Sequence, residues 1–204
     1  MAESANGPTT VLVVDDEAGI RLALDRFLTR QGYRVVQAED AGVALSRLKT
    51  EHPSPQAMLC DVRMPNMSGV DLVPRALAEQ PDLAIIMLTA IDEPRTAIEC
   101  LKLGATDYLI KPIDLDELEV SLQSALRKRQ LEIDRRELER WLANEVALRT
   151  RELEARTDAV AEVALAALAA ASGWAGADDA IGALAQVLGT TREAVVKEIA
   201  RRRG

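Results

Sequence analysis

Histidine and cysteine are scarce in this chain of 204 residues, which contains one histidine and two cysteines. The histidine, His52, lies in a proline-rich loop, so the sequence lacks the histidine clusters that zinc sites, histidine phosphorelay chemistry and histidine-dependent hydrolases require. Cys60 and Cys100 lie in apolar stretches, and we expect them to be reduced core residues of a cytoplasmic protein. These absences exclude the metal and hydrolase chemistry that depends on imidazole.

Long apolar runs and targeting signals are also missing. No apolar stretch reaches the roughly 18 residues that a membrane-spanning helix needs. Residues 1–9 are small and polar, so we expect a disordered N-terminus, no secretion signal, a cytoplasmic location and no membrane contact. The hydrophobic content of 48% is enough for a packed core. The net charge is −8. Acidic side chains dominate up to residue 126 and are balanced by basic ones beyond it, which indicates two regions.

Five short apolar runs alternate with segments of helical periodicity over residues 10–127. We predict strands at residues 10–14, 33–38, 57–61, 83–88 and 107–110. Helices are predicted between the strands, with helix stops at Gly32, near Pro81 and at Gly104. Strands of nearly continuous apolar character are typical of parallel sheets that helices cover on both faces. The sequence therefore predicts an α/β domain with a doubly wound, five-stranded parallel sheet.

Helix-forming residues then continue from Asp114, a candidate N-cap, to Gly173 without a proline or a glycine. Four leucines of the first turns are expected to cover the sheet: Leu115, Leu118, Leu122 and Leu126. Beyond them an apolar stripe continues, but its spacing is not a clean heptad repeat, and Arg149 and Arg156 fall on it. We interpret residues 128–172 as a stuttered coiled coil that forms a homodimer. The alternative is a solvated helix supported by ion pairs along its own surface.

Polar side chains stand at the ends of four of the predicted strands. They are Asp15 and Asp16 after the first strand, Asp61 at the end of the third, Thr89 after the fourth and Lys111 after the fifth. In a doubly wound sheet these strand ends face one crevice. Three carboxylates there repel one another, and an all-oxygen ligand set selects Mg²⁺ in a cell. With a hydroxyl and an ammonium beside it, the central carboxylate is suited to accept a phosphoryl group.

On these motifs, residues 10–127 resemble the receiver domain of bacterial two-component response regulators, whose fold is flavodoxin-like. The resemblance implies that Asp61 accepts a phosphoryl group from a histidine kinase. It also implies that Mg²⁺ is the cofactor, held by Asp15, Asp16, Asp61 and the backbone carbonyl of Arg63. Receivers of this family catalyse only their own phosphoryl transfer and dephosphorylation, so we do not expect an enzyme in any other sense.

The same resemblance implies further roles around the phosphoryl group. Thr89 is the switch hydroxyl, Tyr108 is the aromatic side chain that turns inward when Thr89 moves, and Lys111 binds the phosphoryl group and precedes a proline that is usually cis. Arg63 and Asp92 occupy the two positions that tune the lifetime of the phosphoryl group. They either pair across the site and hinder the attacking water, or are both solvated.

Residues 173–204 are expected to form a small all-helical output module. Ala185, Gly189, Val195 and Ile199 have the spacing of a helix-turn-helix, and the region somewhat resembles the Fis-like output of some response regulators. The candidate DNA contacts are Thr190, Thr191, Arg192, Lys197 and Arg201. Because the region is barely basic, the alternative is a module that caps the dimer or binds a partner protein. In either case we expect phosphorylation to change the packing along the coiled coil.

Overall fold

The computed structural model describes residues 7–90 and 94–171, together with residues 181, 182, 185, 186, 189, 191–193, 195, 197 and 201. The chain divides into two compact units, Met1–Glu137 and Leu138–Gly204. Among the described residues, no helix is both long enough and apolar enough to cross a membrane.

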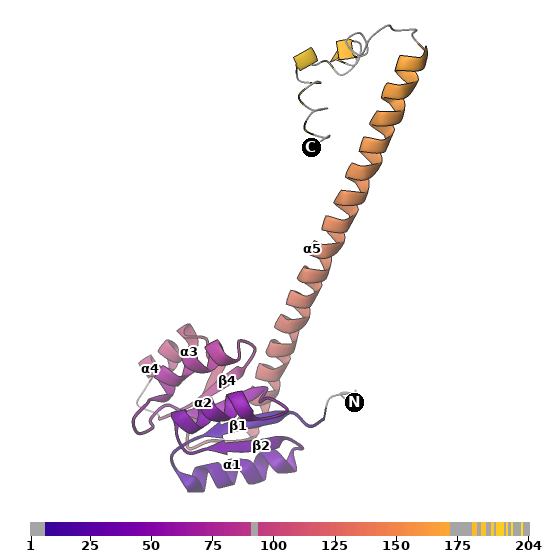
Figure 1. Ribbon diagram of the computed structural model, residues 1–204. Coiled ribbons are helices and arrows are strands. Elements are labelled where there is room, and N and C mark those ends of the chain that lie inside the picture. The colour runs from indigo at the N-terminus through magenta and orange to yellow at the C-terminus, as the bar shows by residue number, and fades with distance from the viewer. Residues whose placement is uncertain are drawn as a thin grey trace. The chain divides into compact units, whose positions relative to one another are not determined.

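The first unit contains a five-stranded parallel sheet with helices on both faces (Figure 1). The strand order is β2-β1-β3-β4-β5, and all four strand pairs are parallel. The strands are β1 (Thr10–Val14), β2 (Arg34–Ala38), β3 (Ala57–Asp61), β4 (Ala84–Ala90) and β5 (Asp107–Lys111). The helices are α1 (Ala18–Arg30), α2 (Ala41–Thr50), α3 (Gly69–Glu79), α4 (Pro94–Lys102) and α5 (Leu115–Ala171). The predicted doubly wound α/β fold, followed by a long helix, is confirmed.

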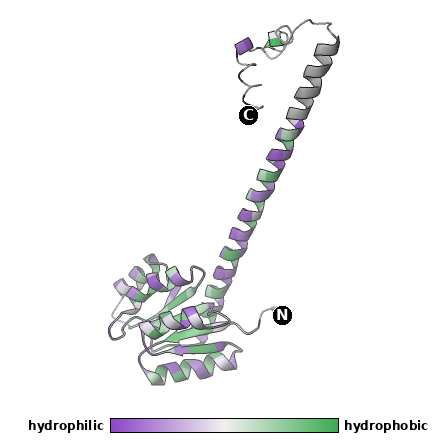
Figure 2. Ribbon diagram, in the orientation of Figure 1, coloured by the Kyte–Doolittle hydropathy of each residue, from purple (hydrophilic) through white to green (hydrophobic). Residues whose placement is uncertain are grey.

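Strand residues alternate between two hydrophobic cores. Leu12 and Val14 of β1 face the core that α2, α3 and Cys100 of α4 cover, whereas Val11 and Val13 face the core under α1 and the first turns of α5. In Figure 2 the strands are mostly hydrophobic and the helices mix both colours. Because β1 and β3 are buried along their whole length, only the strand ends are left to carry polar chemistry.

Asp114 begins α5 as predicted, because its carboxylate accepts hydrogen bonds from the backbone amides of Asp116 and Glu117 at 2.8 and 3.3 Å. Leu118 and Leu122 are fully buried against the sheet. The prediction for Leu115 is wrong, since its side chain is 42% exposed. It lies in the first turn of α5, and Ala125 contributes to the core instead.

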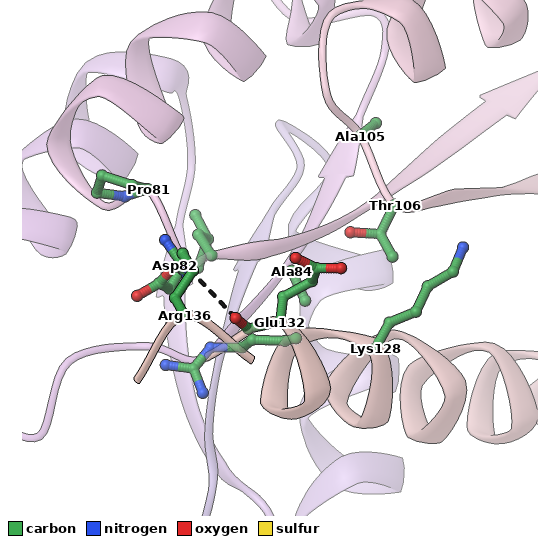
Figure 3. Close-up of a pocket in the computed structure, with 10 residues that line it drawn as sticks. Pro81, Asp82, Ala84, Ala105, Thr106, Lys128, Glu132 and Arg136 are labelled. Atoms are coloured by element: carbon green, nitrogen blue, oxygen red, sulfur yellow. Dashed lines mark hydrogen bonds and ion pairs between the residues drawn. The ribbon is translucent and has the colours of Figure 1, made fainter. Parts of the chain in front are cut away.

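Residues 128–136 of α5 lie against the amino-terminal edge of the sheet. A cavity of about 500 Å³ lies there, between α5 and the segments that precede β4 and β5 (Figure 3). Asp82 forms an ion pair with Arg136 of α5. Burial lowers the pKa of Arg129, and the nearby Asp82 carboxylate partly opposes this lowering. The Arg129 Nε atom is buried without a hydrogen-bond partner. This edge of the sheet thus anchors α5 and is opposite to the edge that holds the carboxylates.

The second unit contains α5 from Leu138 onward and the described C-terminal residues. Residues 181, 182, 185 and 186 are helical, as are 192, 193, 195, 197 and 201. Gly189 between the two groups has φ +61°, a left-handed conformation that suits a turn. Ala185 and Val195 are buried. Ile199, the remaining member of the predicted helix-turn-helix pattern, lies outside the described residues.

Replacing Asp82 with asparagine is expected to loosen the base of α5, because the ion pair to Arg136 is lost. An exposed pair of this kind contributes at most about 1 kcal/mol, so amide hydrogen exchange in residues 128–137 is expected to rise by up to about fivefold. The control is Glu79→Gln on α3, which removes a surface ion pair with Lys49 of α2. Unchanged exchange in Asp82→Asn would contradict an anchoring role for the pair.

Candidate functional site

The predicted polar side chains meet at the carboxyl ends of β1, β3 and β5. In the β1–β3 pair, Val14 lies opposite Cys60, which sets Asp15 beside Asp61. Carboxylate oxygens of Asp15, Asp16 and Asp61 all lie within 4.8 Å of one another. In the sheet, β2 lies on one side of β1 and β3 lies on the other, so the direction of the strand order reverses at β1. The carboxyl ends of β1 and β3 therefore form the topological switch point, where open α/β sheets bind ligands.

Lys111 links two of these carboxylates. Its Nζ lies 2.8 Å from Asp15 Oδ2 and 3.1 Å from Asp61 Oδ2. Asp15 is completely buried and Asp61 is 6% exposed. Buried charges are tolerated only when they are paired, and the ammonium supplies the counter-charge for both.

Burial and pairing act in opposite directions on the ionisation of these groups. Burial raises the pKa of Asp61, the neighbouring Asp15 charge adds to this, and the hydrogen bonds from Lys111 and from the Arg63 backbone oppose it without cancelling it. For Lys111, burial alone would lower the pKa, but the hydrogen bonds to Asp15 and Asp61 outweigh burial and leave the pKa raised. The lysine is therefore firmly a cation, while Asp61 is a more basic carboxylate than usual.

Sequence reasoning missed Arg21, which holds the first acidic loop in place from α1. Its guanidinium donates to the backbone carbonyls of Asp15 at 2.7 Å and Asp16 at 3.1 Å. The Glu17 amide donates to Asp15 Oδ1 at 2.8 Å. An arginine in the first turns of a helix that follows two acids is a usable signal, but many such arginines are solvated, so position alone does not identify it.

Gly69 was also missed as a residue that shapes the site. A Cβ atom at this position would overlap the backbone carbonyl of Asp61 and would also press on Met87. The Gly69 amide donates to the Val62 carbonyl at 2.9 Å. The glycine thus allows α3 to begin directly against the end of β3.

The response regulator receiver domain family, compared as a sequence model, matches residues 11–123 of the chain. The chain belongs to this family. It is 42% identical over 118 residues to the probable transcriptional regulator ycf27 of Porphyridium aerugineum, covering 58% of this chain and 48% of that protein. It is 35% identical over 133 residues to the regulatory protein AtoC of Escherichia coli K12, covering 65% of this chain and 28% of that protein. The chain thus spans less than half the length of these two curated relatives.

The crystal structure of a response regulator receiver domain protein from Clostridium thermocellum is also similar. It has a TM-score of 0.58 and 28% sequence identity, and it covers 60% of this chain and 98% of that one. The family model and this solved structure establish the family and fold of the receiver domain.

The predicted switch residues Thr89 and Tyr108 lie on the neighbouring strands β4 and β5. Thr89 is buried near the end of β4, and its hydroxyl donates to the Ala90 carbonyl at 3.4 Å. Tyr108 of β5 is 38% exposed. The peptide bond between Lys111 and Pro112 is cis.

The two predicted rate-tuning positions differ in what the structure describes. The backbone of Arg63 forms a hydrogen bond to the Asp61 carboxylate, and its side chain is exposed. Asp92 lies outside the described residues. The interpretation in which these two side chains pair therefore stays a prediction.

The candidate DNA contacts lie in the C-terminal unit of the chain. Four of them are exposed: Thr191, Arg192, Lys197 and Arg201. The fifth, Thr190, lies outside the described residues. Exposure is required of residues that contact nucleic acid but does not identify them as such.

The three carboxylates fit the Mg²⁺ ion that receivers of this family are expected to hold. Asp15, Asp16 and Asp61 offer only hard oxygen donors, and their spacing allows one ion to contact all three. The buried thiol beside them does not compete, because burial raises the pKa of Cys60 and keeps it protonated.

Asp61→Asn is expected to stabilise the metal-free protein at neutral pH. The raised pKa of Asp61 means that the folded state binds the proton more tightly than the unfolded chain does, so stability is lost as pH rises from 3.8 through the folded-state pKa. The variant lacks this loss, and its thermal midpoint at pH 7 in a chelating buffer is expected to exceed that of the parent by roughly 2–4 °C. The difference should vanish below pH 3.8, and a lower midpoint at pH 7 would contradict the sign.

Proposed function

We propose that the chain is a response regulator whose Asp61 accepts a phosphoryl group from a histidine kinase in the cytoplasm. The observation that carries the proposal is the Lys111 ammonium, which lies within hydrogen-bond distance of both Asp15 and Asp61 at an edge where three carboxylates converge. A carboxylate nucleophile, a fixed cation and an oxygen-rich metal site are the components that phosphoryl transfer to an acid requires.

In the proposed reaction, a carboxylate oxygen of Asp61 attacks the phosphorus atom of the donor. The bond from phosphorus to the donor's imidazole nitrogen breaks, and an acyl phosphate forms on Asp61. The Lys111 ammonium lies 3.1 Å from Asp61 Oδ2. Because it is this close to the attacking carboxylate, it can also bind the oxygens of the incoming phosphoryl group. Mg²⁺ held by Asp15, Asp16, Asp61 and the Arg63 carbonyl would supply charge neutralisation of the phosphoryl oxygens. Water later hydrolyses the acyl phosphate, at a rate that Arg63 and Asp92 are proposed to tune.

The phosphoryl group is proposed to act on the rest of the chain through Thr89 and Tyr108. The Thr89 hydroxyl donates a hydrogen bond to the new phosphoryl oxygens, and the movement of Thr89 toward them opens space beside it. The Tyr108 ring, which is 38% exposed, then turns inward into this space. The repacking changes the surface made by α4, β5 and α5. Because α5 continues without a break to Ala171, a change at its base reaches the helix beyond the receiver domain.

The proposed output is a homodimer that forms through α5 and presents the C-terminal module. DNA binding is the favoured activity of this module: buried Ala185 and Val195 on either side of a left-handed Gly189 support a helix-turn-helix. The names of the curated relatives as transcriptional regulators support the same activity. The competing proposal is a protein-interaction module, which the acidic residues among the arginines of this region favour.

Asp61→Asn is expected to abolish labelling by acetyl phosphate in Mg²⁺, because the nucleophile is lost while the fold is kept. Asp16→Ala is expected to weaken both labelling and Mg²⁺ binding, since one of the three carboxylates is removed. Asp116→Asn, an exposed acid of α5 outside the cluster, is the matched control and should label like the parent. Labelling of Asp61→Asn at the parental rate would refute the proposed site.

The DNA proposal is tested by binding of the full-length protein to genomic DNA fragments at several salt concentrations. Binding should weaken steeply with salt, and removing one phosphate contact with Lys197→Ala or Arg192→Ala should reduce the slope of log K against log salt by about 1. Arg140→Ala, on the exposed middle of α5, is the control and should leave the slope unchanged. Absence of any salt-dependent binding would favour the protein-interaction module.

A further inference from the structure

Six residues of α5 beyond Glu137 lie on one stripe whose positions repeat every eleven residues. Leu142 and Leu153 are eleven apart, and the same spacing separates Leu138 from Arg149 and Val146 from Thr157. We refer to these six residues as the stalk seam: Leu138, Leu142, Val146, Arg149, Leu153 and Thr157. The four apolar members are 56%, 47%, 63% and 62% exposed in chain order. Within the described chain, this face of α5 is left uncovered.

An eleven-residue spacing differs from the heptad of a coiled coil. Three turns of an α-helix take about 10.8 residues, so side chains eleven apart lie almost above one another. A heptad continued from Leu138 would instead reach Glu145 and Glu152, which are both charged. Repeats of eleven give nearly straight or right-handed helix pairs, whereas heptads give left-handed ones. Leu148, which is 52% exposed, lies off this stripe.

A second copy of the chain is the occupant that matches the stalk seam best, because it brings the same repeat over the same length. In a parallel, in-register pair each apolar layer meets an identical apolar layer, and the Arg149 and Thr157 layers meet only themselves. An antiparallel pair that places Leu142 against Leu153 would also place Arg149 against Val146. That contact would press a guanidinium against an apolar side chain, which is unfavourable without a polar partner.

The charge of Arg149 is already compensated on its own helix. Its Nε lies 3.1 Å from Glu145 Oε1, and its Nη1 lies 3.1 Å from Glu152 Oε2. Two Arg149 side chains can therefore meet across a symmetric pair without unpaired like charges, and a polar layer of this kind disfavours other registers.

We propose that residues 138–157 pair with the same segment of a second copy, parallel and in register, along the eleven-residue stalk seam with Arg149 as its polar layer. The proposal rests on the proposed homodimer and specifies its geometry. Handedness and register follow from the repeat, so the seam predicts which positions of the two helices face each other.

The test is disulfide cross-linking of four variants of the whole chain, each with one added cysteine: Leu142→Cys, Leu153→Cys, Glu145→Cys or Glu152→Cys. The native Cys60 and Cys100 are completely buried, and the parent chain controls for any cross-link that they form. Oxidised samples are compared on non-reducing gels, and light scattering gives the mass of each reduced sample. We expect the two leucine positions to cross-link several-fold more than the two glutamate positions. Mixtures of Leu142→Cys and Leu153→Cys chains should give no cross-link between the two different positions.

Three other outcomes would overturn the proposal. Stronger cross-linking at Glu145→Cys and Glu152→Cys in a dimeric protein would show a heptad seam and would leave the proposed homodimer intact. Cross-links between the two different leucine positions in mixtures would show antiparallel pairing. A monomeric mass for all reduced samples, with no cross-link at any position, would remove the homodimer from the proposed function as well.

Discussion

Burial on both faces of the sheet is the constraint on which this receiver domain depends. β1 and β3 are buried over their whole length between two hydrophobic cores, so a charged side chain in the middle of either strand would have no partner. Charge is tolerated where the strands end, and there the order β2-β1-β3-β4-β5 brings the ends of β1, β3 and β5 to one edge. The acidic cluster is thus a consequence of how a parallel sheet excludes water.

β5 connects this edge to α5. Lys111 at one end of the five-residue strand contacts Asp15 and Asp61. Asp107 at the other end accepts a hydrogen bond of 2.6 Å from Ser121 of α5. A displacement of Lys111 can therefore be transmitted along the backbone of β5 to the hydrogen bond between Asp107 and Ser121 of α5. The Asp82–Arg136 ion pair holds the same helix about four turns further along.

The fold and the central site were predictable because both depend on local patterns. Apolar runs identify the strands, and Asp15, Asp61 and Lys111 stand directly at their ends. The features that the sequence did not predict depend on distances between elements, which hydrophobic periodicity does not encode. The exposure of Leu115 and the contact of Arg136 with Asp82 depend on the line along which α5 crosses the sheet. The need for glycine at residue 69 depends on how closely α3 approaches β3, and no pattern in a single sequence reports that.

The single ammonium among three carboxylates has a consequence for the lifetime of any signal. Asp15, Asp16 and Asp61 with Lys111 leave two negative charges uncompensated, and one divalent cation brings the total to zero. The proposed phosphoryl group on Asp61 would replace one negative charge by roughly two, so the modified site would again carry an excess negative charge. New hydrogen-bond donors drawn into the site would relieve this excess, and so would hydrolysis of the acyl phosphate. One electrostatic imbalance would then both drive the conformational response and limit its duration.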